Sequence, residues 1–235
     1  MSDLDPRTLV RLMKESEHLL EDPYSGKTFR PLWLRRLSIH EEVLGRNNPA
    51  AGSGIGEIRY GYSDSPFGLC RIEVGAQGIL SLNFLDSPKV LDQAAAHALV
   101  LRRWPGVRCA QDRALAETLL GNIFARDSRA PLSLHLRGSQ FHLKVWRSLL
   151  TVPESCLVSY ARLARMADSP GASRAVGGAV ASNPIGYLVP CHRVLRTDGH
   201  LGGFKWGLER KKVMIVYEAA LSDIDFRTAE GARDR

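Results

Sequence analysis

Hydrophobic and polar residues alternate with the two-residue period of β-strands between residues 57 and 84. Strands are predicted over 57–62, 68–74 and 78–84, because turn compositions, Ser-Asp-Ser-Pro and Gly-Ala-Gln-Gly, separate them. The second turn predicts an antiparallel hairpin. Farther along, helices are predicted from Ser87-Pro88 to about Arg103 and over 112–126, and another strand over 132–136. Residues 56–136 are therefore expected to form an α/β domain.

The first 55 residues show a weaker pattern. Asp5-Pro6 is a helix start, and an imperfect apolar stripe continues to about Leu20. Residues 21–55 are mixed, with a linker composition over 47–54. We expect an N-terminal extension, 1–55, without chemistry of its own.

From residue 137 the period becomes helical. Ser139 is expected to cap a helix that Pro153 ends, and Ser159 to cap a helix over 158–167. The turn Asp168-Ser169-Pro170-Gly171 leads into a helix over 172–182, which predicts a helix-turn-helix. A final helix over 208–220, with Val213, Met214 and Tyr217 on its apolar side, completes a second domain, 137–221. Residues 222–235 lack periodicity and are expected to be a disordered tail.

The second helix of this pair consists almost entirely of small residues. Arg174 is its one long side chain, and Gly177 and Gly178 each cost about 1 kcal/mol relative to alanine in a helix. Reading base edges in the major groove needs several long polar side chains, so sequence-specific readout is not expected. A smooth helix fits shape-based docking on DNA, or tight packing inside its own domain. The packing alternative explains Arg174 less well.

The net charge of +7 is confined to the second domain. Residues 137–220 contain 12 Lys/Arg and 5 Asp/Glu, whereas the rest of the chain contains 20 of each. Such segregation indicates a polyanionic partner such as nucleic acid, or a solvated basic face without a partner.

The composition argues against metal-binding, disulfide-rich, membrane-spanning and secreted classes of protein. The four cysteines lie far apart, with no metal-ligand spacing to histidine, so neither a zinc site nor a disulfide framework is expected. No apolar run approaches the ~18 residues of a membrane span, and Met1–Pro6 lacks a signal-peptide core. We therefore expect an intracellular, cytoplasmic protein that does not enter a membrane.

The candidate chemistry lies in Pro190-Cys191-His192-Arg193, directly after the apolar run Ile185–Val189. Cys191 is either a buried cysteine that behaves as a small hydrophobe or a nucleophile beside an imidazole base. The Cys-His pair alone does not decide between them. A glycine-rich loop with one aromatic, 198–207, follows and can cover a pocket.

These residues resemble the O6-alkylguanine-DNA alkyltransferases, or methylated-DNA–protein-cysteine methyltransferases. The likeness covers roughly 57–220. Its motifs, in chain order, are Val158-Ser159-Tyr160, Arg174-Ala175-Val176-Gly177, Asn183-Pro184, Pro190-Cys191-His192-Arg193-Val194 and Tyr217-Glu218. The resemblance implies an RNase H-like α/β domain followed by a mainly α-helical, winged helix-turn-helix-like active-site domain. Residues 40–62 also faintly resemble the end of an AraC-type domain, so the extension is interpreted as a remnant.

The resemblance implies a catalytic role for four residues. Cys191 would accept the alkyl group, His192 would remove the thiol proton through a bridging water, and Glu218 would orient the imidazole. Asn183 would brace the turn before the site, either within this network or as a cap before Pro184. Arg193 is expected to anchor the site.

Base and DNA contacts are implied for a second set. Tyr160 would rotate the nucleotide and donate to the base, and Arg174 would fill the gap left in the stack. The backbone carbonyls of Cys191 and Val194 would accept from the guanine amine. Phe204 and Lys205 would close the pocket, although many relatives carry tyrosine and a small residue or arginine there. Phosphate contacts are expected from Arg162, Arg165, Lys205, Arg210, Lys211 and Lys212.

The implied reaction removes the alkyl group from O6-alkylguanine, and from O4-alkylthymine, in double-stranded DNA. It would run once per molecule, on a monomer, without metal or other cofactor. Gly186, where some relatives have proline, predicts a pocket that admits alkyl groups larger than methyl.

Three alternatives remain open at this stage. A cysteine hydrolase would use Cys191 and His192 for repeated turnover but leaves Arg174 unexplained. A protein that only flags alkylated DNA would lack the cysteine. A plain helix-turn-helix regulator would need a second helix with longer polar side chains.

Overall fold

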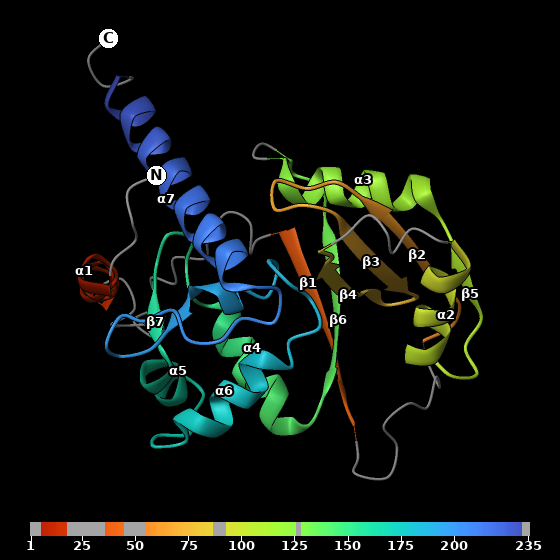
Figure 1. Ribbon diagram of the computed structural model, residues 1–235, viewed down its shortest axis with the longest axis horizontal. Helices are drawn as coiled ribbons and strands as arrows, with labels where there is room; N and C mark the ends of the chain where they lie inside the picture. The colour runs from red at the N-terminus through yellow and green to blue at the C-terminus, as the bar shows by residue number, and fades with distance from the viewer. Residues whose placement is uncertain (1–5, 18–35, 45–54, 87–92, 126–127, 232–235) are drawn as a thin grey trace. The chain divides into compact units, whose positions relative to one another are not determined.

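The computed structural model describes residues 6–17, 36–44, 55–86, 93–125 and 128–231 (Figure 1). The chain divides into two compact units. Unit 1 comprises Met1–Pro31, Val145–Ala181 and Pro190–Arg235, and unit 2 comprises Leu32–Lys144 and Ser182–Val189. This partition differs from the expected domains, since the extension is shared between the units and a short segment after residue 181 belongs to unit 2.

Unit 2 is built on a six-stranded sheet. In spatial order its strands are β1 (Leu37–Val43), β6 (Leu132–Gly138), β4 (Gly78–Phe84), β3 (Cys70–Gly75), β2 (Ile58–Ser63) and β5 (Cys109–Gln111). β3 pairs antiparallel with β2 and β4, which confirms the predicted hairpin, whereas the β1–β6, β4–β6 and β2–β5 pairs are parallel. The sheet is therefore mixed.

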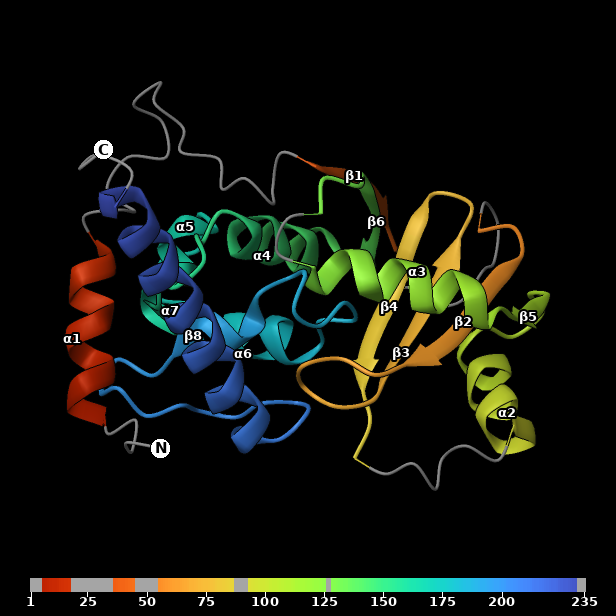
Figure 2. The same ribbon diagram turned by 90° about the horizontal axis from the view of Figure 1, so that it is seen from above.

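Helices α2 (Gln93–Arg103) and α3 (Arg113–Phe124) cover opposite faces of this sheet. Tyr60 of β2 packs in one core cluster with Val100 and Trp104 of α2. Its neighbour Gly61 points the other way, and a Cβ there would lie 2.6 Å from the Ala116 Cβ of α3. A glycine thus allows α3 to lie close against the strands, as Figure 2 shows.

Two strands of this sheet were not predicted. β1 is mostly exposed and its apolar alternation, Leu37, Ile39 and Val43, is interrupted by Glu41, and β5 has only three residues. β1 is held by its parallel pairing with β6 and by Arg137, whose guanidinium donates to both carboxylate oxygens of Glu42, at 2.7 and 2.9 Å. These partners are 95 residues apart in sequence, so local patterning carries no sign of them.

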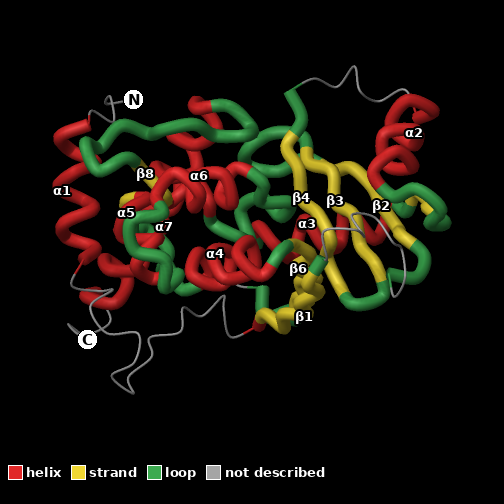
Figure 3. Tube along the Cα trace, turned by 90° about the horizontal axis from the view of Figure 1, so that it is seen from below, coloured by secondary structure: helices red, strands yellow, loops and turns green. Residues whose placement is uncertain are grey.

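Unit 1 is mainly helical (Figure 3). Its helices are α1 (Pro6–Glu17), most of α4 (Gln140–Leu150), α5 (Tyr160–Met166), α6 (Ser173–Ala181) and α7 (Leu208–Gly231). Strands β7 (Val158–Ser159) and β8 (Val194–Leu195) form a small parallel pair, and Cys191–Arg193 form a single 3-10 turn, η4. The predicted order of helices is confirmed here.

The N-terminal helix belongs to the core of unit 1. Leu9 and Met13 of α1 pack in one cluster with Leu157, Leu195 and Ile215, and Leu9 is only 1% exposed. The extension therefore supplies a packed element that sequence analysis did not expect.

Helix α7 corrects two expectations. It continues to Gly231, so the segment expected to be a disordered tail from Ser222 is helical up to that residue; no proline or glycine interrupts it earlier. Its buried face is formed by Lys211, Met214, Ile215 and Glu218. Val213, expected on the apolar side, is 40% exposed, because two charged residues occupy the buried stripe instead.

Within the described ranges, none of the helices combines the length and the apolar character that crossing a membrane requires.

Candidate active site

The parallel pair β7–β8 brings two chemical segments of unit 1 together. Val158 pairs with Val194 and Ser159 with Leu195, so Tyr160, which begins α5, starts beside the strand that follows Cys191. Cys191 begins the η4 turn, and its carbonyl accepts from Val194 N–H. Its side chain is buried, with 4% exposed. The thiol is therefore held inside the unit by backbone pairing.

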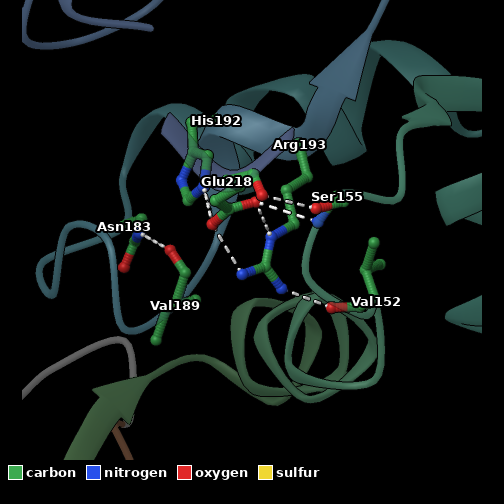
Figure 4. Close-up of polar contacts among 7 residues, drawn as sticks. All are labelled: Val152, Ser155, Asn183, Val189, His192, Arg193 and Glu218. Atoms are coloured by element: carbon green, nitrogen blue, oxygen red, sulfur yellow. Dashed lines mark hydrogen bonds and ion pairs between the residues drawn. The ribbon is translucent and has the colours of Figure 1, made fainter. Parts of the chain in front are cut away.

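His192 and Glu218 form a buried pair (Figure 4). The imidazole Nε2 lies 2.8 Å from Glu218 Oε1, and the two side chains are 0% and 2% exposed. The ionised Glu218 can only accept a hydrogen bond here, so the neutral imidazole carries its hydrogen on Nε2 and keeps the Nδ1 lone pair as its basic site.

Arg193 and Ser155 complete the coordination of the same carboxylate. Arg193 donates from Nε to Oε2 (2.9 Å) and from NH2 to Oε1 (2.7 Å), while its NH1 donates to the Val152 carbonyl. Ser155 donates its backbone N–H to Oε2 (3.3 Å) and its hydroxyl to the Glu218 carbonyl (2.8 Å). Ser155 has φ +61°, a left-handed conformation that no feature of the sequence indicates.

The pKa values of Glu218 and His192 are shifted so that the carboxyl group is ionised and the imidazole is neutral, as a general base requires. Burial opposes ionisation of Glu218, but the positive charge of Arg193 and the His192 contact outweigh it and hold the Glu218 pKa well below its usual range. Burial also lowers the pKa of His192, although Glu218 opposes this. Because Arg193 already neutralises Glu218, we favour a carboxylate beside a neutral imidazole.

Asn183 lies in unit 2, where it braces the loop that leads to Pro190. Its Nδ2 donates to the Val189 carbonyl (2.8 Å) and the Ile185 carbonyl (3.3 Å), and its Oδ1 accepts from Ile185 N–H (3.0 Å). Ile185 forms a bridge with Leu82 of β4, and Gly186 N–H donates to the Leu82 carbonyl. Asn183 thus holds the shape of residues 183–189, and its part in the catalytic network stays a prediction.

Tyr160 stands between the glycine-rich loop and α6. Its hydroxyl lies 3.2 Å from the position of a Cβ on Gly202, and its ring 3.8 Å from that of a Cβ on Gly177. Burial, with a smaller effect of the Cys191 charge, raises the Tyr160 pKa, so the phenol stays protonated and can donate. Gly202 also has φ +66°, which disfavours any side chain there.

Helices α5 and α6 have the expected turn between them. Ser159 caps α5 by accepting from Arg162 N–H at 3.1 Å, as predicted. On α6, Val176, Ala179 and Val180 are buried, whereas Arg174, Ala175, Gly178 and Ala181 are exposed. A Cβ on Gly178 would meet nothing within 4 Å. Tight packing inside the unit therefore does not account for this glycine, and the exposed stripe is smooth except for Arg174.

The glycine-rich loop carries the remaining predicted residues. The Phe204 ring packs edge-on against Trp206, with centroids 5.4 Å apart, and Lys205 Nζ lies 4.9 Å from the Trp206 centroid. Val194 is fully buried in β8.

The position of Lys211 contradicts the expectation that this side chain contacts phosphate. Its side chain is 0% exposed, and Nζ donates to the backbone carbonyls of Val194 (2.6 Å) and Leu201. It cannot reach a phosphate from there. Lys212 remains at the surface, paired with Glu209 at 2.7 Å.

Chemically, unit 1 offers a buried thiol, a neutral imidazole whose orientation a carboxylate fixes, and a phenol donor. All four cysteines are free thiols. Within the described part of the chain, no group of three or more His, Cys, Asp or Glu is arranged to hold a metal ion. The set fits covalent chemistry at sulfur.

Comparisons with known proteins agree with this chemistry. The sequence pattern of the family described as "6-O-methylguanine DNA methyltransferase, DNA binding domain" matches residues 140–220. The bifunctional transcriptional activator/DNA repair enzyme Ada of Escherichia coli is 33% identical over 170 residues, covering 69% of this chain and 46% of that protein. A methylated-DNA–protein-cysteine methyltransferase of Mycolicibacterium paratuberculosis is 44% identical over 100 residues, covering 42% and 61%. The chain spans about half the length of the curated relatives it matches.

Solved structures of proteins of the same kind resemble this chain over most of their own length. The crystal structure of Mycobacterium tuberculosis O6-methylguanine methyltransferase has a TM-score of 0.54 at 30% identity, covering 69% of this chain and 93% of that one. The M. tuberculosis OGT structure in complex with DNA has a TM-score of 0.53 at 28% identity, with the same coverage. The likeness thus extends from the reactive motif to both units. The chain belongs to the methylated-DNA–protein-cysteine methyltransferase family, the O6-alkylguanine-DNA alkyltransferases.

Proposed function

We propose that this protein repairs DNA by transferring the alkyl group of O6-alkylguanine to Cys191. The observation that carries the proposal is the buried Cys191, followed directly in the sequence by His192, whose imidazole Glu218 orients at 2.8 Å, in a chain of this family. An SN2 displacement at an alkyl carbon needs a soft nucleophile, and a thiolate is the strongest that a protein offers.

In the proposed reaction His192 Nδ1 takes the Cys191 proton through a water, because Nε2 is engaged with Glu218. A bond forms between sulfur and the alkyl carbon, and the bond from that carbon to O6 breaks, leaving its electron pair on guanine. Tyr160 donates a hydrogen bond to the base. The proton taken up by His192 is returned through the water to the guanine anion, which remains in the DNA as neutral guanine. No group in the site reverses the thioether, so each molecule reacts once.

The O6 substituent lies inside the base stack, so the nucleotide must leave the duplex to reach a thiol with 4% exposure. We propose that α5 and α6 dock as a winged helix-turn-helix-like module, and that Arg174 occupies the gap in the stack. The exposed stripe of α6 supports this, because it has no side chain beyond Arg174 that would hold a DNA surface away. Unit 2 is proposed to be the RNase H-like domain.

Incubation with duplex DNA carrying a labelled methyl at guanine O6 tests the proposal. One label per chain, on the Cys191 peptide, is the expected result. Cys191→Ser should bind DNA with unchanged affinity and take no label, and Cys156→Ser, at another buried free cysteine, is the matched control that should keep full labelling. Release of product without labelled protein would favour a cysteine hydrolase, and binding without transfer would favour a protein that only flags damage.

The substrate range is proposed separately. O4-alkylthymine presents a comparable alkyl ether, and Gly186 predicts room for larger groups. Equal rates of inactivation by methyl and benzyl adducts would support that room, whereas a strong preference for methyl would exclude it.

A further inference from the structure

The face of α1 that is turned away from the core of unit 1 carries three cations. Arg7, Arg11 and Lys14 are exposed. Leu9 and Met13, on the same helix, are buried. Since successive residues of an α-helix are about 100° apart around its axis, the three cations fall within an arc of about 60°, opposite the two buried residues. Arg7, Arg11 and Lys14 therefore form a basic ridge on α1.

Helix α1 is packed on the segments that form the candidate site. Leu9 lies in one core cluster with Leu157, which directly precedes β7, and with Leu195 of β8. β7 leads into Tyr160 at the start of α5, and β8 follows the η4 turn that begins at Cys191. Among the described elements, none covers the side of α1 that faces away from this strand pair (Figure 2). The basic ridge thus belongs to the same packed assembly as the reactive thiol.

The loop between β8 and α7 adjoins α1. Leu9 lines a cavity of about 510 Å³ together with Arg196, His200 and Leu201 of this loop. One Asp198 carboxylate oxygen lies 3.3 Å from Arg196 NH2 and the other lies 3.2 Å from His200 Nδ1, so the loop itself adds little net charge. The loop includes the glycine-rich stretch that is expected to close the pocket over the base. The basic ridge therefore stands beside a segment that the proposed reaction brings close to DNA.

A row of exposed guanidinium and ammonium groups fits the phosphates of a nucleic-acid backbone. Arg7 and Lys14 are about 10 Å apart along the axis of α1, because an α-helix rises about 1.5 Å per residue. Each strand of a duplex carries one phosphate about every 3.4 Å along the axis, so the basic ridge can face about three phosphates. Such contacts hold a protein on DNA without reading its sequence, which agrees with the shape-based docking proposed for α6.

We propose that α1 is a further DNA-contacting element, whose basic ridge binds backbone phosphates of the duplex beside the extruded nucleotide. The inference rests on the proposed function for its partner, duplex DNA. Because α1 lies outside residues 140–220, which the family pattern matches, that pattern does not account for its cations. The contact adds affinity for any duplex, damaged or not, and makes this added affinity sensitive to salt.

The test measures equilibrium binding to an unmodified duplex by fluorescence anisotropy, from about 50 to about 200 mM salt. In such titrations each phosphate contact contributes about 0.9 to the slope of log K against log salt concentration. The combined variant Arg7→Gln, Arg11→Gln and Lys14→Gln should therefore lower the magnitude of the slope by about 2–3 and weaken binding at low salt by more than about tenfold. Lysine at positions 7 and 11 keeps the charge and should keep the slope.

The matched control removes three exposed cations from unit 2. It combines Arg59→Gln, Arg102→Gln and Arg108→Gln, has the same net charge as the α1 variant, and should change the slope by less than one contact. Arg11→Gln alone, in the middle of the basic ridge, should lose about one contact, and it keeps the test valid should the triple variant unfold.

A wild-type slope in the folded α1 variants would overturn the proposal, since the basic ridge would then be a solvated face. An equal loss in the unit 2 control would also overturn it, because total charge alone would explain the effect. Transfer of labelled methyl is measured separately on the wild type. Its absence would refute the proposed function and leave the salt dependence of α1 standing, whereas normal transfer with an unchanged slope would refute only the role of α1.

Discussion

Replacing Gly178 with alanine separates the stability of α6 from its proposed contact with DNA. Gly178 is exposed, lies within the regular helix, and a Cβ there would meet nothing within 4 Å. Alanine is favoured over glycine in a helix interior by about 1 kcal/mol. The variant should therefore be more stable than the wild type, with a melting temperature raised by about 2–4 °C for a chain of this size.

DNA affinity should change in the opposite direction. If the backbone of α6 lies against the duplex, the added methyl group clashes with the DNA, just as an extra methylene clashes in a packed protein interior. The clash should weaken the free energy of DNA binding by about 1 kcal/mol or more. That cost corresponds to at least about fivefold weaker binding. Fluorescence anisotropy with an unmodified duplex at constant salt measures this, and differential scanning calorimetry measures the stability.

Gly121→Ala is the matched control. Gly121 is an exposed glycine in α3 of unit 2, and a Cβ there would also meet nothing within 4 Å. It should gain similar stability and bind DNA as the wild type does. Equal DNA affinity of Gly178→Ala and Gly121→Ala would refute docking through this face of α6. The presence of Gly177 and Gly178 in the helix would then have no explanation.

Three further outcomes are expected. Arg174→Ala, at an exposed position, should change the free energy of unfolding by less than about 0.5 kcal/mol yet slow transfer from duplex DNA more than from single-stranded DNA; equal slowing on both would contradict the gap-filling role. Glu218→Gln leaves Arg193 buried without its counterion and should cost about 3–5 kcal/mol in urea unfolding at pH 7. Because the Glu218 pKa is depressed in the folded protein, the ionised Glu218 contributes fully to the free energy of unfolding above the unfolded pKa near 4.5, and this contribution is lost as the pH falls. The difference in free energy of unfolding between wild type and Glu218→Gln should therefore narrow towards pH 3. For Lys211 the folded pKa of about 8 lies below the unfolded value of 10.5, so the wild type should gain stability relative to Lys211→Met between pH 8 and 10; a constant difference in urea midpoint would contradict a buried, titrating ammonium.

Local sequence signals predicted those parts of the fold whose causes are local. Ser159 caps α5 because its hydroxyl reaches a backbone N–H three residues on, and the Gly75–Gly78 turn closes the β3–β4 hairpin. Strand β1 could not be predicted this way. It is mostly exposed, Glu41 interrupts its apolar alternation, and it is held by pairing with residues 95 positions away.

The sequence by itself determined the reactive motif, the order of the helices, the unusual smoothness of α6 and the concentration of positive charge in the second half of the chain. Only the tertiary structure decided which charged residues lie inside. Arg210-Lys211-Lys212 reads as one basic surface cluster, yet Lys211 is buried against two carbonyls while Lys212 stays at the surface. The buried face of α7 is set by what surrounds it, and polar partners contributed by β8, the glycine-rich loop, His192 and Arg193 make burial of Lys211 and Glu218 possible. Hydrophobic periodicity does not record such partners, because they come together only when the chain has folded.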